Sequence, residues 1–210
     1  MQRGERSAVS DQRPYAALLA KGEDRRQQIL VAAQRLLTRH GWRGITLGQI
    51  AREAGVTPAG LLHHFASKED LLHAAIDARD AYDRAHADFS GDLVVEVARV
   101  AERMRQAPDL VCMFAVLMME NVDPDAPLHA RLLDRHRGGV DAVARLIREG
   151  QRTGRYRTDL DPAVKALEIV AFINGMESIW LLDPSIPLTQ VFKEYTGSLA
   201  RQLAPSPDSP

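Results

Sequence analysis

The sequence predicts an all-α protein of about nine helices. Apolar residues recur at spacings of three and four along successive segments, which is the periodicity of helices with a buried face. Residues that favour helix starts and stops separate these segments, among them aspartate, threonine, glycine and proline. No segment shows the sustained two-residue alternation or the hairpin turn residues that would indicate strands.

The chain opens with a polar, arginine-bearing segment at residues 1–22, which we expect to be a disordered arm. A first helix is expected from Asp24 to His40. Its apolar residues fall on one helical stripe, formed by Ile29, Leu30, Ala33, Leu36 and Leu37.

Two short helices are expected next, each with its own start signal. Thr46 and Gln49 form a capping box, in which each side chain accepts a hydrogen bond from the other residue's backbone N–H. Gly55 ends the first of these helices, because glycine adopts the left-handed backbone conformation without strain. Thr57 is a favourable N-cap for the second, and Pro58 suits its first helical position.

The second short helix is expected to have a buried side and an outward side. Leu61 and Phe65 are four residues apart and therefore share the buried side. Ser67 caps a third helix. Two capped helices joined by a tight turn form a helix-turn-helix, whose second helix can enter a DNA major groove. The expected DNA-binding residues are Thr46, Gln49, Thr57, Pro58, Ala59, Gly60, Leu62, His63, His64 and Lys68.

The outward side is poor in side chains that read bases through paired hydrogen bonds, since no Arg, Asn or Gln lies in residues 57–64. Base readout would therefore use His63 and apolar contacts of Pro58, Ala59 and Leu62 with thymine methyl groups. Gly60 would allow a close approach of the backbone to the groove.

Four polar side chains are placed to hold phosphates, which sets the register on DNA without reading its sequence: Thr46, Thr57, His64 and Lys68. His64 could equally make a structural hydrogen bond within the motif. Gln49 could reach DNA or serve as the capping partner alone. For the whole segment, the alternative is an ordinary helical corner without a ligand.

Residues 46–72 resemble the DNA-binding signature of the tetracycline-repressor (TetR) family of bacterial regulators. The matching residues are Thr46, Ile50-Ala51, Ala54-Gly55-Val56, Leu61, His64-Phe65, Ser67-Lys68-Glu69 and Leu71-Leu72. The chain departs from the family at Leu62, where a tyrosine that contacts phosphate is common. The resemblance implies a regulator, by default a repressor, with a ligand-binding C-terminal domain and a dimer interface on the last two helices.

The rest of the chain is expected to form one helical domain. Its apolar segments run from Leu71 to about Phe89, then over Leu93–Gln106, Leu110–Met119, Pro127–Gln151, Ala163–Leu182 and Thr189–Leu203. We therefore divide the chain into a helix-turn-helix domain at 23–69, an effector-binding and dimerisation domain at 70–204 and a disordered tail at 205–210.

The segment Ala163–Leu182 is apolar on nearly all sides, so it needs burial on more than one side. A single chain could supply that burial. We favour a homodimer, because two helix-turn-helix motifs can read a pseudo-palindromic operator that one motif cannot select. The expected interface residues are Val170, Ile173, Trp180, Phe192, Tyr195 and Leu199.

A small-molecule effector is the third expected partner, after operator DNA and a second copy of the chain. Methionine adapts to irregular apolar surfaces, so a methionine-rich segment is the candidate pocket lining, with core packing as the alternative. The expected lining is Met104, Met113, Phe114, Leu117, Met118, Phe172 and Met176. The effector itself is expected to be largely apolar.

Composition agrees with this reading. Hydrophobic residues make up 45% and charged residues 26% of the 210 residues, as in globular proteins. The net charge is −1, but residues 1–80 carry 12 basic and 9 acidic side chains, the sign expected of a DNA-facing part. A single cysteine, Cys112, no secretory signal and no membrane-length apolar run favour a cytoplasmic protein without membrane contact.

Other classes of function have little support in the sequence. It contains no HExxH, CxxC, phosphate-binding glycine loop or nucleophile elbow, so we expect neither an enzyme nor a cofactor or metal. An architectural DNA-binding dimer without an effector is the stronger rival. The size of the C-terminal half argues against it, because dimerisation alone needs fewer helices.

Overall fold

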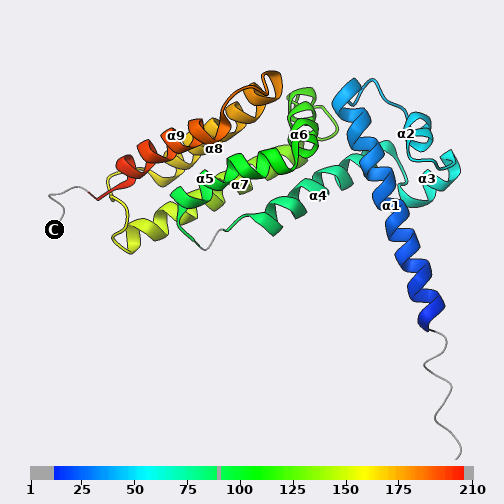
Figure 1. Ribbon diagram of the computed structural model, residues 1–210, viewed down its shortest axis with the longest axis horizontal. Helices are drawn as coiled ribbons and strands as arrows, with labels where there is room; N and C mark the ends of the chain where they lie inside the picture. The colour runs from blue at the N-terminus through cyan, green and yellow to red at the C-terminus, as the bar shows by residue number, and fades with distance from the viewer. Residues whose placement is uncertain (1–11, 89–90, 206–210) are drawn as a thin grey trace, which may run out of the picture. The chain divides into compact units, whose positions relative to one another are not determined.

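The computed structural model describes residues 12–88 and 91–205, which form nine α-helices and no strand (Figure 1). The prediction of an all-α fold is confirmed. The helices are α1 (Gln12–His40), α2 (Leu47–Glu53), α3 (Pro58–His64), α4 (Lys68–His86), α5 (Leu93–Gln106), α6 (Pro108–Glu120), α7 (His129–Arg152), α8 (Pro162–Leu182) and α9 (Leu188–Leu203).

Two helix ends differ from the sequence prediction by more than about two residues. Helix α1 begins at Gln12, so residues 12–22 are helical and do not belong to a disordered arm. Alanine and leucine dominate residues 16–20, and both favour helix, which explains the longer helix. Helix α4 ends at His86 rather than near Phe89. The rest of the expected arm, residues 1–11, and nearly all of the expected tail lie outside the described residues.

The chain forms two compact units, one ending at Ala75 and the other beginning at Ile76. This division falls a little after the expected boundary at residues 69 and 70. Helix α4 belongs to both units, since its first turns lie in the N-terminal unit and its later turns in the C-terminal one.

The N-terminal unit has a core of fully buried aliphatic and aromatic side chains. Helix α2 contacts both α1 and α3. The core contains Ile29, Ala33 and Leu37 of α1, Ile45 and Ile50 around the start of α2, and Leu61 and Phe65 at α3. Burying a side chain of this size contributes roughly 1.5–3 kcal/mol, so these residues fix the two short helices against α1.

The C-terminal unit is a helical bundle in which α7 packs on α8, α5 packs on α9 and α6 packs on α8 (Figure 1). Its core joins α5, α7, α8 and α9 through Val97, Val100, Met104, Ile147, Ile169, Phe192 and Leu199. Asp92 caps α5 and Asp161 caps α8, each accepting hydrogen bonds from two backbone N–H groups of the first turn.

Ion pairs attach α4 to α7 within this unit. Arg131 of α7 lies 2.9 Å from Asp77 and 2.7 Å from Asp80 of α4. Arg135, one turn further along α7, lies 2.6 Å from Asp80 and 2.5 Å from Asp83. Asp77 is exposed, but the other charges are partly buried and form a network, so together they hold α4 more firmly than isolated surface pairs would.

No helix among the described residues has the length and apolar character needed to cross a bilayer.

Near the end of α7, the buried Gly150 faces the ring of Tyr156, which is also buried. The backbone N–H groups of Arg155 and Tyr156 both donate to the carbonyl of Gly150, at 2.8 and 3.0 Å. A β-carbon at position 150 would overlap the Tyr156 ring. Glycine is therefore required here by packing.

Replacing Gly150 with alanine should lower the free energy of unfolding by about 1–3 kcal/mol, because the methyl group forces the Tyr156 ring to move. Gly138→Ala in the same helix is the matched control, since a β-carbon there meets nothing within 4 Å. Alanine favours helix over glycine, so the control should be neutral or slightly stabilised. Urea denaturation of both variants makes the measurement, and equal stabilities would contradict this packing account.

Candidate functional site

The helix-turn-helix predicted from the sequence is present in the N-terminal unit. Thr46 and Gln49 form the expected capping box, with the Gln49 N–H 3.2 Å from Thr46 Oγ1 and the Thr46 N–H 2.8 Å from Gln49 Oε1. Gly55 has a φ of 66°, the left-handed conformation expected of it. Thr57 caps α3 by accepting a hydrogen bond from the Gly60 N–H at 3.0 Å.

The outward side of α3 is open to solvent. Pro58, Ala59 and His63 are exposed, and Leu62 retains 49% of its surface although it is a large apolar residue. Leu61 and Phe65 are fully buried on the opposite side, as predicted. The burial of Leu61 and Phe65 therefore keeps Leu62 and His63 on the solvent side of the helix.

The polar residues predicted around this surface differ in their surroundings. Thr46, Gln49 and Thr57 are exposed, but their side chains already make the capping hydrogen bonds. His64 is half-buried with its ring edge against His63, 5.4 Å between ring centres. Lys68 donates from Nζ to the Trp42 carbonyl at 2.7 Å and stacks over the Trp42 ring at 3.8 Å.

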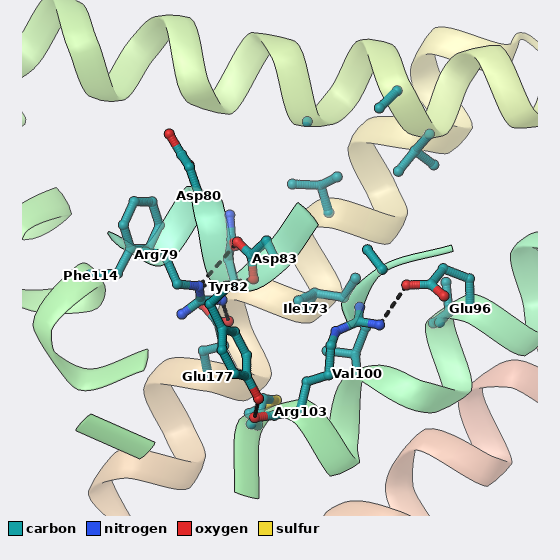
Figure 2. Close-up of a pocket in the computed structure, with 18 of the residues that line it drawn as sticks. Arg79, Asp80, Tyr82, Asp83, Glu96, Val100, Arg103, Phe114, Ile173 and Glu177 are labelled. Carbon is teal, nitrogen blue, oxygen red and sulfur yellow. Dashed lines mark hydrogen bonds and ion pairs between the residues drawn. The ribbon is translucent and has the colours of Figure 1, made fainter. Parts of the chain in front are cut away.

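The C-terminal unit contains a cavity of about 460 Å³ lined by α4, α5, α6, α7 and α8 (Figure 2). Two of the seven expected pocket residues, Met104 and Phe114, line it. The other five do not line this cavity: Met113 and Leu117 are buried in the core, and Met118, Phe172 and Met176 lie outside the lining. Helical periodicity could not show which side of α6 and α8 faces the cavity.

Ionised side chains gather at the α4 end of this cavity (Figure 2). Arg79 lies at their centre, with Nε 3.1 Å from Asp83 and Nη2 2.9 Å from Glu177 of α8. Its Nη1 is buried and has no acceptor among the described residues, and its guanidinium carbon lies 5.6 Å from the centre of the Phe114 ring. Burial lowers the pKa of Arg79, but the adjacent Glu177 and Asp83 outweigh it and raise the pKa above its usual value.

The charges that line the cavity pair with one another. Besides the pairs of Arg79, Arg103 forms an ion pair of 2.5 Å with Glu96 within α5. Arg135 forms ion pairs with Asp80 and Asp83. The remaining lining arginine, Arg84, is exposed to solvent. Glu177 could have been noticed in the sequence as a carboxylate within an otherwise apolar stretch, whereas the pairing of Arg79 required the tertiary structure.

The two sides of α8 differ in burial. One side, with Ile169, Val170, Ile173, Asn174 and Glu177, lines the cavity. The opposite side carries a row of exposed apolar residues, which we name the α8 stripe: Val164 is 65% exposed, Leu167 49%, Ile179 53% and Leu182 87%. The described residues of the chain therefore leave an apolar helix face uncovered.

The six predicted interface residues do not lie on this stripe. Val170 and Ile173 are half-buried and line the cavity, while Phe192 and Leu199 are each 1% exposed in the core. Trp180 and Tyr195 are half-buried. Tyr195 stacks on Phe172 with 3.6 Å between ring centres, and burial raises its pKa to about 12.

Comparison with known proteins matches both units to family models. Residues 29–75 match the model described as bacterial regulatory proteins, tetR family. Residues 92–193 match the model described as the tetracyclin repressor-like C-terminal domain.

Individual relatives agree with these matches. The chain is 29% identical over 182 residues to the helix-turn-helix-type transcriptional regulator TtgR of Pseudomonas putida, covering 78% of this chain and 83% of TtgR. It is 27% identical over 154 residues to the transcriptional repressor AcnR of Corynebacterium diphtheriae, covering 73% and 80%. A crystal structure of a TetR-family regulator from Rhodococcus sp. superposes with a TM-score of 0.69 at 26% identity, covering 87% of this chain and all of that one.

Proposed function

The chain belongs to the TetR family of DNA-binding transcriptional regulators, and from this premise we propose that it is a repressor that binds a pseudo-palindromic operator as a homodimer. The observation that carries the proposal is the exposed outward side of α3, held in place by caps and by two buried anchors. The name of its relative AcnR, a transcriptional repressor, supports the direction of regulation.

The outward side of α3 suits a major groove by shape and by chemistry. We assign base contacts to Pro58, Ala59, Leu62 and His63, because three of them can meet thymine methyl groups. The small Gly60 lies at the same surface and allows close approach.

Phosphate contacts would come from groups at the ends of the short helices. The hydroxyl groups of Thr46 and Thr57 and the half-buried His64 are retained as candidates. Gln49 acts first as a capping partner. Lys68 is a weaker candidate than the sequence suggested, because Trp42 already binds its ammonium group.

The α8 stripe supports the homodimer. Four large aliphatic side chains exposed along one face of a helix are costly in a monomer, and pairing with a two-fold mate would bury them. In this proposal the stripe replaces the six residues expected from the sequence as the centre of the interface. Tyr195 and Trp180 could add contacts at its margin.

The cavity supports regulation by a small molecule. Its volume falls in the range of ligand-binding sites. Helix α4 begins in the helix-turn-helix unit and contributes Arg79, Asp80 and Asp83 to the cavity wall. A ligand that favours a different position of α4 would change the affinity for operator DNA, by reciprocal coupling of the two sites.

Two further parts of the proposal follow from the family. The protein acts in the cytoplasm, where its operator is, and it regulates transcription without enzymatic activity of its own.

An architectural DNA-binding dimer without an effector is the second candidate. The cavity favours the regulated form, because dimerisation does not require a cavity.

Replacing Leu62 and His63 together with glutamate should weaken binding to a duplex selected from random DNA by at least about 100-fold, since two base contacts at roughly 1–3 kcal/mol each are lost and carboxylates face phosphates. The matched control is Val95→Glu with Thr189→Glu, an exposed apolar and an exposed polar residue in the C-terminal unit. Fluorescence anisotropy with a labelled duplex measures the DNA affinity of the α3 variant and of the control. Binding by the α3 variant that equals the control would refute the assignment.

Replacing Leu167 with glutamate should convert the dimer to a monomer, because a charge within the α8 stripe would have to be buried in the interface. Val95→Glu is a close control, since Val95 is 48% exposed and Leu167 49%. Sedimentation velocity gives the mass of each variant. A Leu167→Glu protein that stays dimeric at micromolar concentration would show that the chains pair through another surface.

A further inference from the structure

Asn174 is a neutral polar side chain of the cavity wall whose amide the rest of the protein leaves unused. Asn174 lines the cavity from α8, one turn before Glu177 and adjacent to Ile173. Its backbone carbonyl accepts a hydrogen bond from Ser178 Oγ at 3.1 Å. Its side-chain amide makes no hydrogen bond with any residue that the structure describes, and it is not enclosed by protein atoms as Arg79 Nη1 is.

The ionised groups around Asn174 are already paired. Arg79 forms ion pairs with Glu177 and Asp83, and Arg103 forms one with Glu96. The paired groups on the cavity wall are three arginines and four carboxylates, while the solvent-exposed Arg84 supplies a fourth positive charge. The wall is therefore close to electrically neutral. An ion beside the paired groups would lose its hydration without finding a free counter-ion, which is costly. Arg84 lies outside these pairs, but it is exposed to solvent, where water weakens its attraction for an anion.

The remaining wall is apolar. Val97, Val100, Met104, Val111, Ile169 and Ile173 surround the space beside the charged end. A ligand body in contact with these side chains gains by leaving water, and a polar group on it must find a partner inside the cavity. The Asn174 amide can donate to a carbonyl or hydroxyl oxygen and can accept from a hydroxyl group.

We propose that the cavity selects a neutral, largely apolar molecule with a carbonyl or hydroxyl group, which forms a hydrogen bond with the Asn174 amide. This inference rests on the proposed function, because it names the chemical class of the effector. Asn174 is the specificity-determining residue, and the paired charges exclude ligands that carry a carboxylate or an ammonium group.

Four probes of one shape test this selectivity: 4-acetylbiphenyl, 4-ethylbiphenyl, biphenyl-4-carboxylate and 4-(aminomethyl)biphenyl in its ammonium form. Isothermal titration calorimetry on the full chain, without DNA, measures their affinities. The ketone should bind about tenfold tighter than the ethyl compound, the value of one additional hydrogen bond. Both ions should bind at least about tenfold more weakly than the ketone.

Two variants connect the selectivity to Asn174. Asn174→Leu should fold normally because no hydrogen bond of the side chain is lost, and it should bind the ketone and the ethyl compound equally. Asn174→Asp adds an unpaired carboxylate, so it should shift the preference to the ammonium probe. Arg131→Met, in the ion network but outside the cavity lining, should keep the order of the parent protein.

The inference fails if an ion binds tightest to the parent, if no probe binds, or if Asn174→Leu retains the preference for the ketone. These measurements involve neither operator DNA nor the state of association. Such a failure would therefore leave the tests of DNA binding and dimerisation unaffected, whereas a failure of those tests would not alter the affinities of the four probes.

Discussion

Helix α3 depends on interactions at its ends and on two buried side chains, and the function of the protein depends on α3. A helix of seven residues is too short to be stable alone in water. The Thr57 hydroxyl accepts a hydrogen bond from the N–H of Gly60 in the first turn of the helix. Gly55 has a positive φ, which allows the tight turn between α2 and α3. Leu61 and Phe65 then fix its rotation by full burial. Only this combination keeps Leu62 and His63 on the outside, where a duplex could reach them.

In the C-terminal unit, one side of α8 faces the cavity and the opposite side is exposed. Its inner side closes a cavity with paired charges on its wall, where Arg79 of α4 forms ion pairs with Asp83 of the same helix and Glu177 of α8. Its outer side is the apolar α8 stripe, which a partner would cover. Because α4 supplies part of the charged wall and is continuous with the helix-turn-helix unit, the proposed ligand would act on the DNA-binding part by rearranging these ion pairs.

Local signals in the sequence were sufficient for the fold and for the DNA-reading helix. The capping box at Thr46, the glycine at 55 and the spacing of Leu61 and Phe65 depend on neighbours a few residues away, so the pattern and the structure agree. The cavity and interface depend on which way a helix is rotated. Helix α8 is apolar on nearly all sides, so periodicity could not distinguish its inner Ile173 from its outer Leu167. The Arg79–Glu177 pair joins residues 98 positions apart, and no local pattern predicts it.

Selection of bound duplexes from a random DNA pool tests the central claim most directly. If two α3 helices related by a two-fold axis read the major groove, the recovered sequences should share a pseudo-palindrome with half-sites about one helical turn apart. Thymines should recur where Pro58, Ala59 and Leu62 lie against the bases. Recovery of no common sequence, or of a single unpaired half-site, would contradict the account.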